Sequence, residues 1–300
     1  MSEQPVLYKL SRPMLFAAAL IWGTSFFIMK NTVDDVPVFF LLAFRFSVAA
    51  GVLALVFLRR WKEASSGLFL RGCVMGALLF AAYVSQTFGL VETSASNNAF
   101  LTAAYCVMVP FLAWLFYRRR PDLFHIIGAV LLVAGIGLLS LRDGFSMGRG
   151  DLLTLLGALF YGLHIISGAR FAQKFDVLLL TVVQFGMAAV LSWVFYFITG
   201  SRPGPLSGGT LAALLYLAVL CTTVALLFQN IGQKYCPPTA ASVLLSLESV
   251  FGALFAILVG QDSLTLRAAA GFVLIFLAVL SAETKFSFLR GKKGPAETGP

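Results

Sequence analysis

The sequence predicts an all-α membrane protein with ten transmembrane helices, arranged as two inverted repeats of five, and with both termini in the cytoplasm. Three observations lead to this prediction: an apolar composition, ten apolar segments of membrane-spanning length, and a match between the two halves of the chain. Of the 300 residues, 59% are hydrophobic and only 12% are charged. A globular surface has to be wetted by polar side chains, so this balance excludes an ordinary soluble domain.

The first five apolar segments cover residues 14–32, 37–58, 70–91, 94–117 and 123–141. Each is long enough, at a rise of about 1.5 Å per residue, to form a helix across the hydrocarbon core of a bilayer. Acidic, basic, Pro or Gly residues stand between most of them, as at ordinary helix ends. Many more segments follow the first one, so we expect it to remain as a span and not to be removed as a signal peptide.

The last five segments cover residues 151–171, 177–199, 209–233, 237–260 and 266–284. Their connections, like those of the first five, are short, so segments adjacent in the sequence should mostly lie antiparallel in space. No connection is long enough to form a soluble domain. The chain is therefore expected to consist almost entirely of membrane helices.

The basic residues predict the orientation of these segments. With the N-terminus inside, sixteen Lys and Arg side chains fall on the inner side and five on the outer side, while Arg45 lies inside a span. Cytoplasmic loops carry such an excess, so both termini are predicted to be cytoplasmic. The bias also supports the count of ten, because one missed span would invert every later loop. It explains the net charge of +9, and we expect no nucleic-acid partner.

The second half of the sequence resembles the first. An offset of 143 gives nine identities over the 53 positions from 86 to 138, including Gln86 with Gln229. An offset of 139 serves the earlier spans and pairs Trp22 with Tyr161. Polar residues are scarce here, so the glutamine match is harder to attribute to chance than the apolar ones.

Spans 1–5 then correspond to spans 6–10, and five crossings per repeat force the second repeat to be inverted. Inverted repeats are a common plan of secondary transporters, which bind substrate between the halves near the bilayer midplane. We expect a first repeat in 1–143, a second in 144–286, and a disordered basic cytoplasmic tail in 287–300.

Four stretches resemble EamA-type members of the drug/metabolite transporter superfamily. They are "ALIWGTSFFIMK", "LLAFRFSVAA", "SASNNAFLTAAYCVMVPFLAWLFYRRRP" and "PPTAASVLLSLESVFGALFAILVG", and the resemblance covers nearly the whole chain. It implies ten spans in two inverted repeats and transport of small metabolites, often the export of amino acids from bacteria. The architecture resembles the branch that exports aromatic amino acids. The sequence departs from the family pattern at Ser249, where proline is usual, and at Gln261–Asp262, where a Gly-Glu pair often ends span 9.

Glu248 lies about eleven residues into its span, about 16 Å deep at the rise of a helix, near the bilayer centre. A charge there costs at least about 2.5–3.5 kcal/mol, so the carboxylate should face a cavity or a partner. Three roles are open: binding of a substrate ammonium, carriage of a coupled proton, or a permanent structural contact, which would be an ion pair or a hydrogen bond to a helix end.

Arg45 is about nine residues into span 2 and equally deep. We favour a structural role, in which its five N–H donors tie several helices together. The alternative is an ion pair with Glu248 that forms in one transport state and breaks in the other.

A polar stripe runs along span 4. Asn98, Thr102 and Tyr105 are spaced by four and three residues and share one helix face. Such a stripe either lines a cavity or makes hydrogen bonds between helices, and we favour the cavity. Ser246 and Ser249 belong to a similar stripe on span 9.

Other polar and aromatic side chains inside spans are further candidates for the cavity wall. Trp22 and Tyr161 lie too deep for the interfacial belt of aromatic residues, so they could stack on a substrate or close a gate. His164 is a candidate proton carrier, although we favour a buried neutral His. The residues predicted to bind substrate are Trp22, Tyr83, Gln86, Asn98, Thr102, Tyr105, Tyr161, His164, Gln229, Ser246 and Glu248.

Two further patterns concern helix geometry. Gly72 and Gly76, spaced by four, predict close packing of two helices. Pro110 is expected to bend span 4, because proline removes a helical hydrogen bond.

The sequence offers no chemistry typical of an enzyme. It contains no Walker lysine motif, no His/Cys spacing for a metal and, with two histidines, no convincing Ser/His/Asp set. We therefore predict no enzymatic activity, no cofactor and no metal.

The predicted function is secondary transport of a small metabolite, most plausibly a zwitterion such as an amino acid, as an exporter or a uniporter. The expected partners are membrane lipids, the substrate and, as a candidate coupling ion, the proton. The expected location is a bacterial inner membrane, where the protein would be a monomer or a homodimer. The alternative is a lipid flippase or an intramembrane enzyme that modifies lipid.

Overall fold

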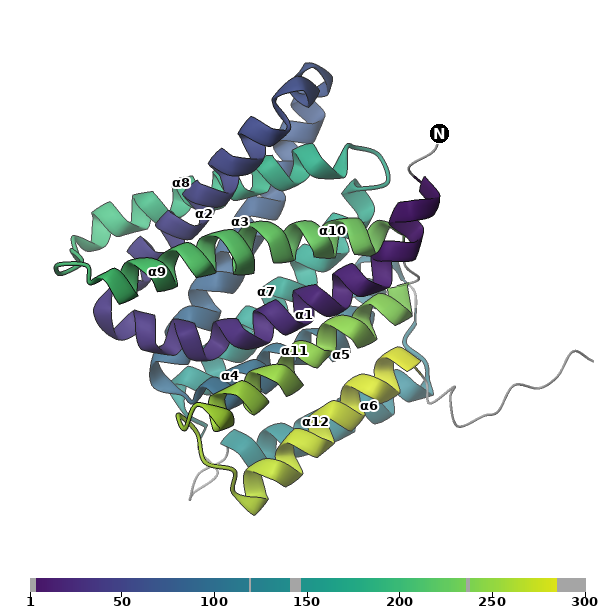
Figure 1. The fold of residues 1–300 in the computed structure, drawn as a ribbon. Coiled ribbons are helices and arrows are strands. Elements are labelled where there is room, and N and C mark those ends of the chain that lie inside the picture. Colours follow the sequence, from purple (N-terminus) through teal and green to yellow (C-terminus); the bar gives the residue numbers. More distant parts are fainter. Residues whose placement is uncertain (1–3, 119, 141–146, 236–237, 285–300) are drawn as a thin grey trace, which may run out of the picture.

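The structure, a computed structural model, describes residues 4–118, 120–140, 147–235 and 238–284. Within these ranges the regular structure is helical and contains no strand (Figure 1). The predicted tail, 287–300, lies outside the described residues. The helical elements are α1 (Gln4–Asp35), α2 (Val38–Val56), η1 (Leu58–Glu63), α3 (Ser66–Glu92), α4 (Ala95–Thr102), α5 (Ala104–Tyr117), α6 (Leu123–Ser140), α7 (Arg149–Phe171), α8 (Val177–Thr199), α9 (Gly208–Tyr216), η2 (Leu217–Val224), α10 (Ala225–Tyr235), α11 (Pro238–Leu258) and α12 (Leu266–Thr284).

Each of the ten predicted segments falls on helix. By length and composition, seven helical stretches in the described part of the chain are able to cross a membrane. The other three predicted segments coincide with the shorter apolar helices 123–139, 244–258 and 266–281. The structure therefore confirms an α-helical membrane architecture, while ten crossings stay a prediction.

Two of the predicted segments depart from a regular, continuous α-helix. Span 4 is divided at Ala103 into α4 and α5, seven residues before Pro110, where the sequence predicts a bend. Span 8 is continuous but contains a π-helical stretch, η2, between α9 and α10. Both interruptions border the cavity described below.

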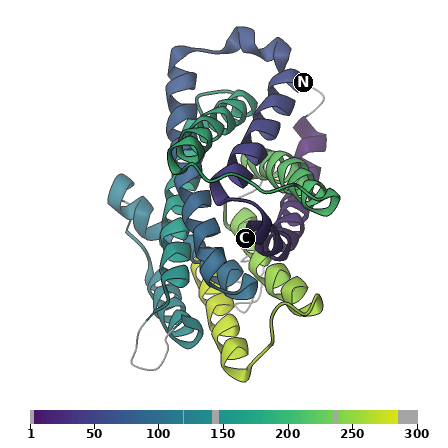
Figure 2. The ribbon, with the colours of Figure 1, turned by 90° about the vertical axis from the view of Figure 1, so that its left-hand side faces the viewer.

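The helices of the two halves pair in corresponding ways. At opposite edges of the bundle, α2 packs against α8 and α6 packs against α12 (Figures 1 and 2). In the middle, α1 packs along α10 and α11, and α7 packs along α3 and against both α4 and α5. With spans 1–5 matched to spans 6–10, each of these contacts has its counterpart in the other half.

Glycines allow the closest of these contacts. A methyl group on Gly89 of α3 would lie 2.7 Å from the carbonyl oxygen of Gly150 on α7. A methyl group on its repeat partner, Gly232 of α10, would lie 2.6 Å from a side-chain carbon of Leu15 on α1. Gly89 and Gly232 thus permit the same helix approach in both halves.

The prediction of close packing at Gly72 and Gly76 is confirmed. A methyl group on Gly72 would lie 2.5 Å from a Val183 side-chain carbon, and one on Gly76 would lie 2.5 Å from the carbonyl oxygen of Gln184. The contact joins α3 to α8.

One end of the bundle is closed by polar contacts that we call the latch, formed by Lys30, Asn31, Ser96, Gln261 and Asp262. The Lys30 ammonium donates to three backbone carbonyls at the end of α3, at 2.7–2.9 Å. Gln261 Nε2 donates to Asn31 Oδ1 at 2.6 Å and to a carbonyl of α1 at 3.1 Å. Asp262 Oδ2 accepts from the backbone N–H of Ser96 at 2.8 Å. The latch therefore holds the end of α11 against α1 and α4.

Gly76→Ala is expected to lower the apparent melting temperature of the detergent-purified protein. The added methyl group meets backbone oxygen, so α3 and α8 must separate, at a cost of about 1–3 kcal/mol. Gly51→Ala on α2 is the matched control, because a Cβ there has no neighbour within 4 Å. Equal melting temperatures for the two variants would contradict the close-contact interpretation.

Candidate functional site

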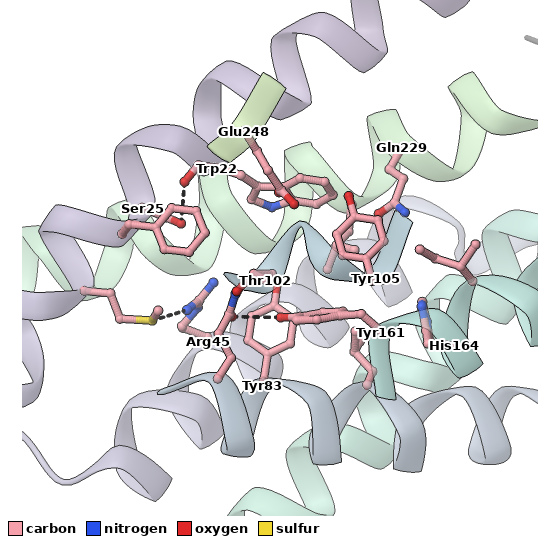
Figure 3. A pocket seen from close by; sticks show the side chains of 16 residues that line it. Trp22, Ser25, Arg45, Tyr83, Thr102, Tyr105, Tyr161, His164, Gln229 and Glu248 are labelled. Carbon is pink, nitrogen blue, oxygen red and sulfur yellow. Dashed lines mark hydrogen bonds between the residues drawn. The ribbon is translucent and has the colours of Figure 1, made fainter. Parts of the chain in front are cut away.

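A cavity of about 50 Å³ lies between the two halves of the bundle (Figure 3). Its wall comes from α1, α2, α3, α4, α5, α7, α10 and α11, which adds span 2 to the helices that the sequence analysis would place there. The residues that line it are Trp22, Ser25, Phe26, Met29, Arg45, Leu79, Tyr83, Gln86, Thr102, Tyr105, Tyr161, His164, Ile165, Leu226, Gln229 and Glu248.

Most of the residues predicted from the sequence meet at this cavity. Asn98 and Ser246 are the exceptions: both are buried, and neither lines the cavity. Substrate binding by the others stays a prediction. Those that line the cavity are Trp22, Arg45, Tyr83, Gln86, Thr102, Tyr105, Tyr161, His164, Gln229 and Glu248.

The cavity is built from repeat partners. Twelve of its sixteen lining residues fall into six pairs at the two offsets found in the sequence, three pairs at 139 and three at 143. Both members of each pair face the same space, so the cavity lies where the two halves meet. The pairs are Trp22 with Tyr161, Ser25 with His164, Phe26 with Ile165, Tyr83 with Leu226, Gln86 with Gln229, and Tyr105 with Glu248.

Glu248 is the carboxylate of the cavity. Its side chain is 6% exposed and reaches in from α11 beside Trp22 (Figure 3). Its repeat partner, Tyr105, faces the same cavity. Neither salt bridge in the described part of the chain contains Glu248, so no basic side chain pairs with it there.

Arg45 supplies the positive charge and is only 1% exposed. Its Nε donates to Thr222 Oγ1 at 2.9 Å, and its Nη1 donates to the sulfur of Met29 at 3.3 Å. The guanidinium carbon lies 5.0 Å from the ring centroid of Tyr83, a cation–π distance. Within the described residues Arg45 also forms no salt bridge, so the Arg45–Glu248 pair considered from the sequence is not formed in this state.

The π-helical segment η2 holds cavity residues in place. Thr222 and Thr223 bond back to the carbonyls five residues earlier, at 2.8 and 2.9 Å. Trp22 Nε1 donates to the backbone oxygen of Cys221 at 2.8 Å, and Arg45 donates to Thr222. Segments of this kind often occur at functional sites. Here η2 orients both an aromatic ring and the guanidinium.

Gln86 connects three helices around the cavity. Its Oε1 accepts from the Tyr161 hydroxyl at 2.9 Å, and its Nε2 donates to Thr102 Oγ1 at 3.0 Å. Asn98, one turn before Thr102, donates instead to the Gln86 backbone oxygen at 3.1 Å and to Thr154 Oγ1 at 2.7 Å. The stripe on span 4 is thus divided, because Asn98 makes contacts between helices and Thr102 and Tyr105 face the cavity.

The two serines on span 9 are buried within the helix bundle and do not line the cavity. Ser249 Oγ donates to the backbone oxygen of Ser246 at 2.8 Å within α11, and both side chains are buried. Ser246 therefore shares its helix with Glu248 but not the cavity wall.

His164 lies at the far side of the cavity and is held by Gln184 of α8. The His164 Nε2 and Gln184 Oε1 atoms are 2.7 Å apart, and His164 is 4% exposed. With the amide oxygen in this position, Nε2 carries the proton. This arrangement fits a neutral His fixed by one hydrogen bond.

Six lining residues lie outside the predicted set: Ser25, Phe26, Met29, Leu79, Ile165 and Leu226. Five are apolar, and the sequence alone does not distinguish an apolar side chain that lines a cavity from one that packs between helices. Ser25 could have been predicted as a cavity residue from the sequence, because the offset of 139 makes it the repeat partner of His164.

The two halves of the chain match one family. Residues 12–141 and, separately, residues 148–282 match the EamA-like transporter family. The chain belongs to this family. It is 34% identical to an uncharacterized transporter of Archaeoglobus fulgidus over 89% of this chain and 83% of that protein. It is 25% identical to the uncharacterized inner membrane transporter YedA of Escherichia coli over 91% of each chain.

This EamA-like chain also resembles a solved crystal structure in fold. The TM-score is 0.70 at 18% sequence identity, with 94% of this chain and 99% of that chain covered. The family and the apolar helices together identify a multi-pass membrane protein of a transporter family.

Thr222→Val should destabilise the protein more than Thr223→Val. Both side chains are buried and both substitutions are nearly isosteric, but only Thr222 accepts a hydrogen bond from a buried guanidinium. Loss of a hydrogen bond to a charged group costs about 1.5–3 kcal/mol. Thermal unfolding in detergent measures the difference, and equal shifts for the two variants would show that Thr222 does not hold Arg45.

Proposed function

We propose that the protein is a secondary transporter, an exporter or a uniporter, that moves a small zwitterionic metabolite such as an amino acid across the membrane. The observation that carries the proposal is the cavity built from six pairs of repeat partners. A site shared by two equivalent halves can be exposed to one side and then to the other when the halves exchange conformations.

The proposed topology has ten crossings, two inverted repeats and both termini in the cytoplasm. The equivalent helix contacts of the two halves support the repeats. Figure 1 adds that α1 begins and α12 ends at the same end of the bundle, as an even number of crossings requires. The excess of basic residues supports a cytoplasmic position for that end. The proposed location is a bacterial inner membrane, which the name of the relative YedA supports.

The charges of the cavity favour a zwitterion. Glu248 and Arg45 face the space from different helices without pairing with each other (Figure 3). An ammonium group would neutralise Glu248 and a carboxylate would neutralise Arg45, and each charge in the bilayer interior requires such a partner. Trp22, Tyr83 and Tyr161 offer ring faces to the rest of the substrate.

The latch suggests how the site is closed on one side. Gln261 and Asp262 hold α11 to α1 and α4, and the proposed topology puts this end outside. Release of these contacts would open the cavity outward. Protons are a candidate coupling ion, with Glu248 as their carrier.

Glu248→Gln tests substrate and coupling together. In proteoliposomes loaded with a panel of labelled amino acids, the natural protein should exchange at least one of them. If Glu248 binds the ammonium, the variant should lose affinity by at least about tenfold at every pH, which corresponds to about 1.4 kcal/mol. If Glu248 carries a proton, the variant should keep exchange and lose its pH dependence. A variant with the natural affinity and the natural pH profile would exclude both roles, and movement of lipid without amino-acid exchange would favour a flippase.

The latch predicts a reversible block of transport. In a cysteine-free background, Asn31→Cys with Gln261→Cys should allow a short thiol-reactive cross-linker to join α1 to the end of α11, because the two native side chains are 2.6 Å apart. Uptake should stop on cross-linking and return when a reducible linker is cleaved. Each single-cysteine variant is the control. Full transport by the cross-linked protein would rule out opening at the latch.

A further inference from the structure

A second concave surface lies outside the substrate cavity, between α5, α6 and α7. It has a volume of about 680 Å³ and is lined by apolar side chains, including Phe111, Trp114 and Leu132. Arg118, at the end of α5, is its charged lining residue. We call this surface the α5 groove.

The groove arises from a difference between the halves. Gly23 of α1 approaches α11 so closely that an added methyl group would lie 3.1 Å from the backbone carbonyl carbon of Phe251. At its repeat partner, Gly162 of α7, the nearest atoms are the ends of two side chains of α5, at 2.9 and 3.6 Å. The backbone of α5 therefore stands farther from α7 than α11 stands from α1.

Arg118 shows the same difference at the helix end. Its repeat partner, Gln261, ties α11 to α1 through Asn31 and a backbone carbonyl. In the described part of the chain, no hydrogen bond or ion pair joins the Arg118 side chain to α7. The residue ends α5 in the left-handed conformation, with φ of 59°. It thus leaves a guanidinium at the rim of an apolar groove.

We propose that the α5 groove binds one phospholipid with an anionic headgroup, with an acyl chain between α5, α6 and α7 and the phosphate on Arg118. Trp114 and Leu115 are 46% and 66% exposed, and in a membrane the medium that covers such side chains is hydrocarbon. An arginine pairs well with a phosphate through two parallel N–H bonds. The proposal depends on the membrane location and not on the transported substrate.

The groove contains its own spectroscopic probe. In a variant with Trp22, Trp61 and Trp193 changed to Phe, Trp114 fluorescence reports contact with brominated acyl chains. Brominated phosphatidylglycerol should reach half-maximal quenching at a mole fraction about fivefold lower than brominated phosphatidylcholine, the preference expected from one basic residue. Arg118→Gln should remove the preference and leave quenching at the phosphatidylcholine level.

Two controls make the result specific. Arg120→Gln changes an exposed arginine that does not line the groove and should keep the preference. A variant that retains only Trp193, on α8, should respond equally to both lipids. Equal quenching of Trp114 by both lipids, or the same preference at Trp193, would overturn the proposal. Shielding of Trp114 that increases with protein density would also overturn it, because a second copy would then cover the groove.

Native mass spectrometry of the chain with all four tryptophans gives an independent test, in which Arg118→Gln should lose bound phosphatidylglycerol.

Discussion

The burial of two ionisable side chains, Arg45 and Glu248, in the interior of a membrane protein is the constraint from which the rest of this structure follows. Arg45 and Glu248 are 1% and 6% exposed, and neither is in a described salt bridge. An uncompensated charge there would destabilise the fold, so both must be solvated by protein groups. Arg45 obtains a hydroxyl, a thioether and a tyrosine ring, and Glu248 lies in a cavity lined by Tyr105, Trp22 and Gln229. These contacts come from neighbouring helices, so the helices have to meet around a polar centre and cannot pack as a uniform apolar bundle.

The interruption at η2 is a consequence of this need. In an ideal α-helix each mid-helix carbonyl already accepts a backbone hydrogen bond, and only its second lone pair remains for another donor. The wider turn of η2 is supported by Thr222 and Thr223, whose hydroxyls bond back five residues. One carbonyl and one hydroxyl of the segment can then receive Trp22 and Arg45. The same deviation from ideal geometry thus solvates a charge and fixes an aromatic wall.

The sequence predicted the parts of the structure that depend on apolar length and on the internal repeat. All ten segments are helical, and the offsets that align the halves also pair most of the cavity wall. The break at Ala103 was not predictable, because "TAAYC" carries no helix-breaking residue and the expected bend was assigned to Pro110. Asn98 was assigned to the cavity because it shares a face with Thr102, yet Thr154 of α7 lies within reach and captures its amide. Helix periodicity gives the face of a residue, but it does not give the neighbour that this face meets.

The two halves of the chain differ in the conformation of one pair of equivalent segments, spans 4 and 9. If two inverted repeats were identical in conformation, both ends of the cavity would be equally closed, and no alternation would result. Here α11 is a single helix held to α1 by Gln261, whereas its counterpart is divided at Ala103 and its second part, α5, stands away from α7. Exchange of these two conformations would bring α5 onto α7 and free α11 from α1. The end of the bundle at Arg118 would then close while the latch end opens. The division at Ala103 lies between Thr102 and Tyr105, so a movement of α5 about it would displace Tyr105 from the cavity that it shares with Glu248. In the proposed transport cycle, movement of the helix end would in this way change the surroundings of the buried carboxyl group through one short segment of the chain.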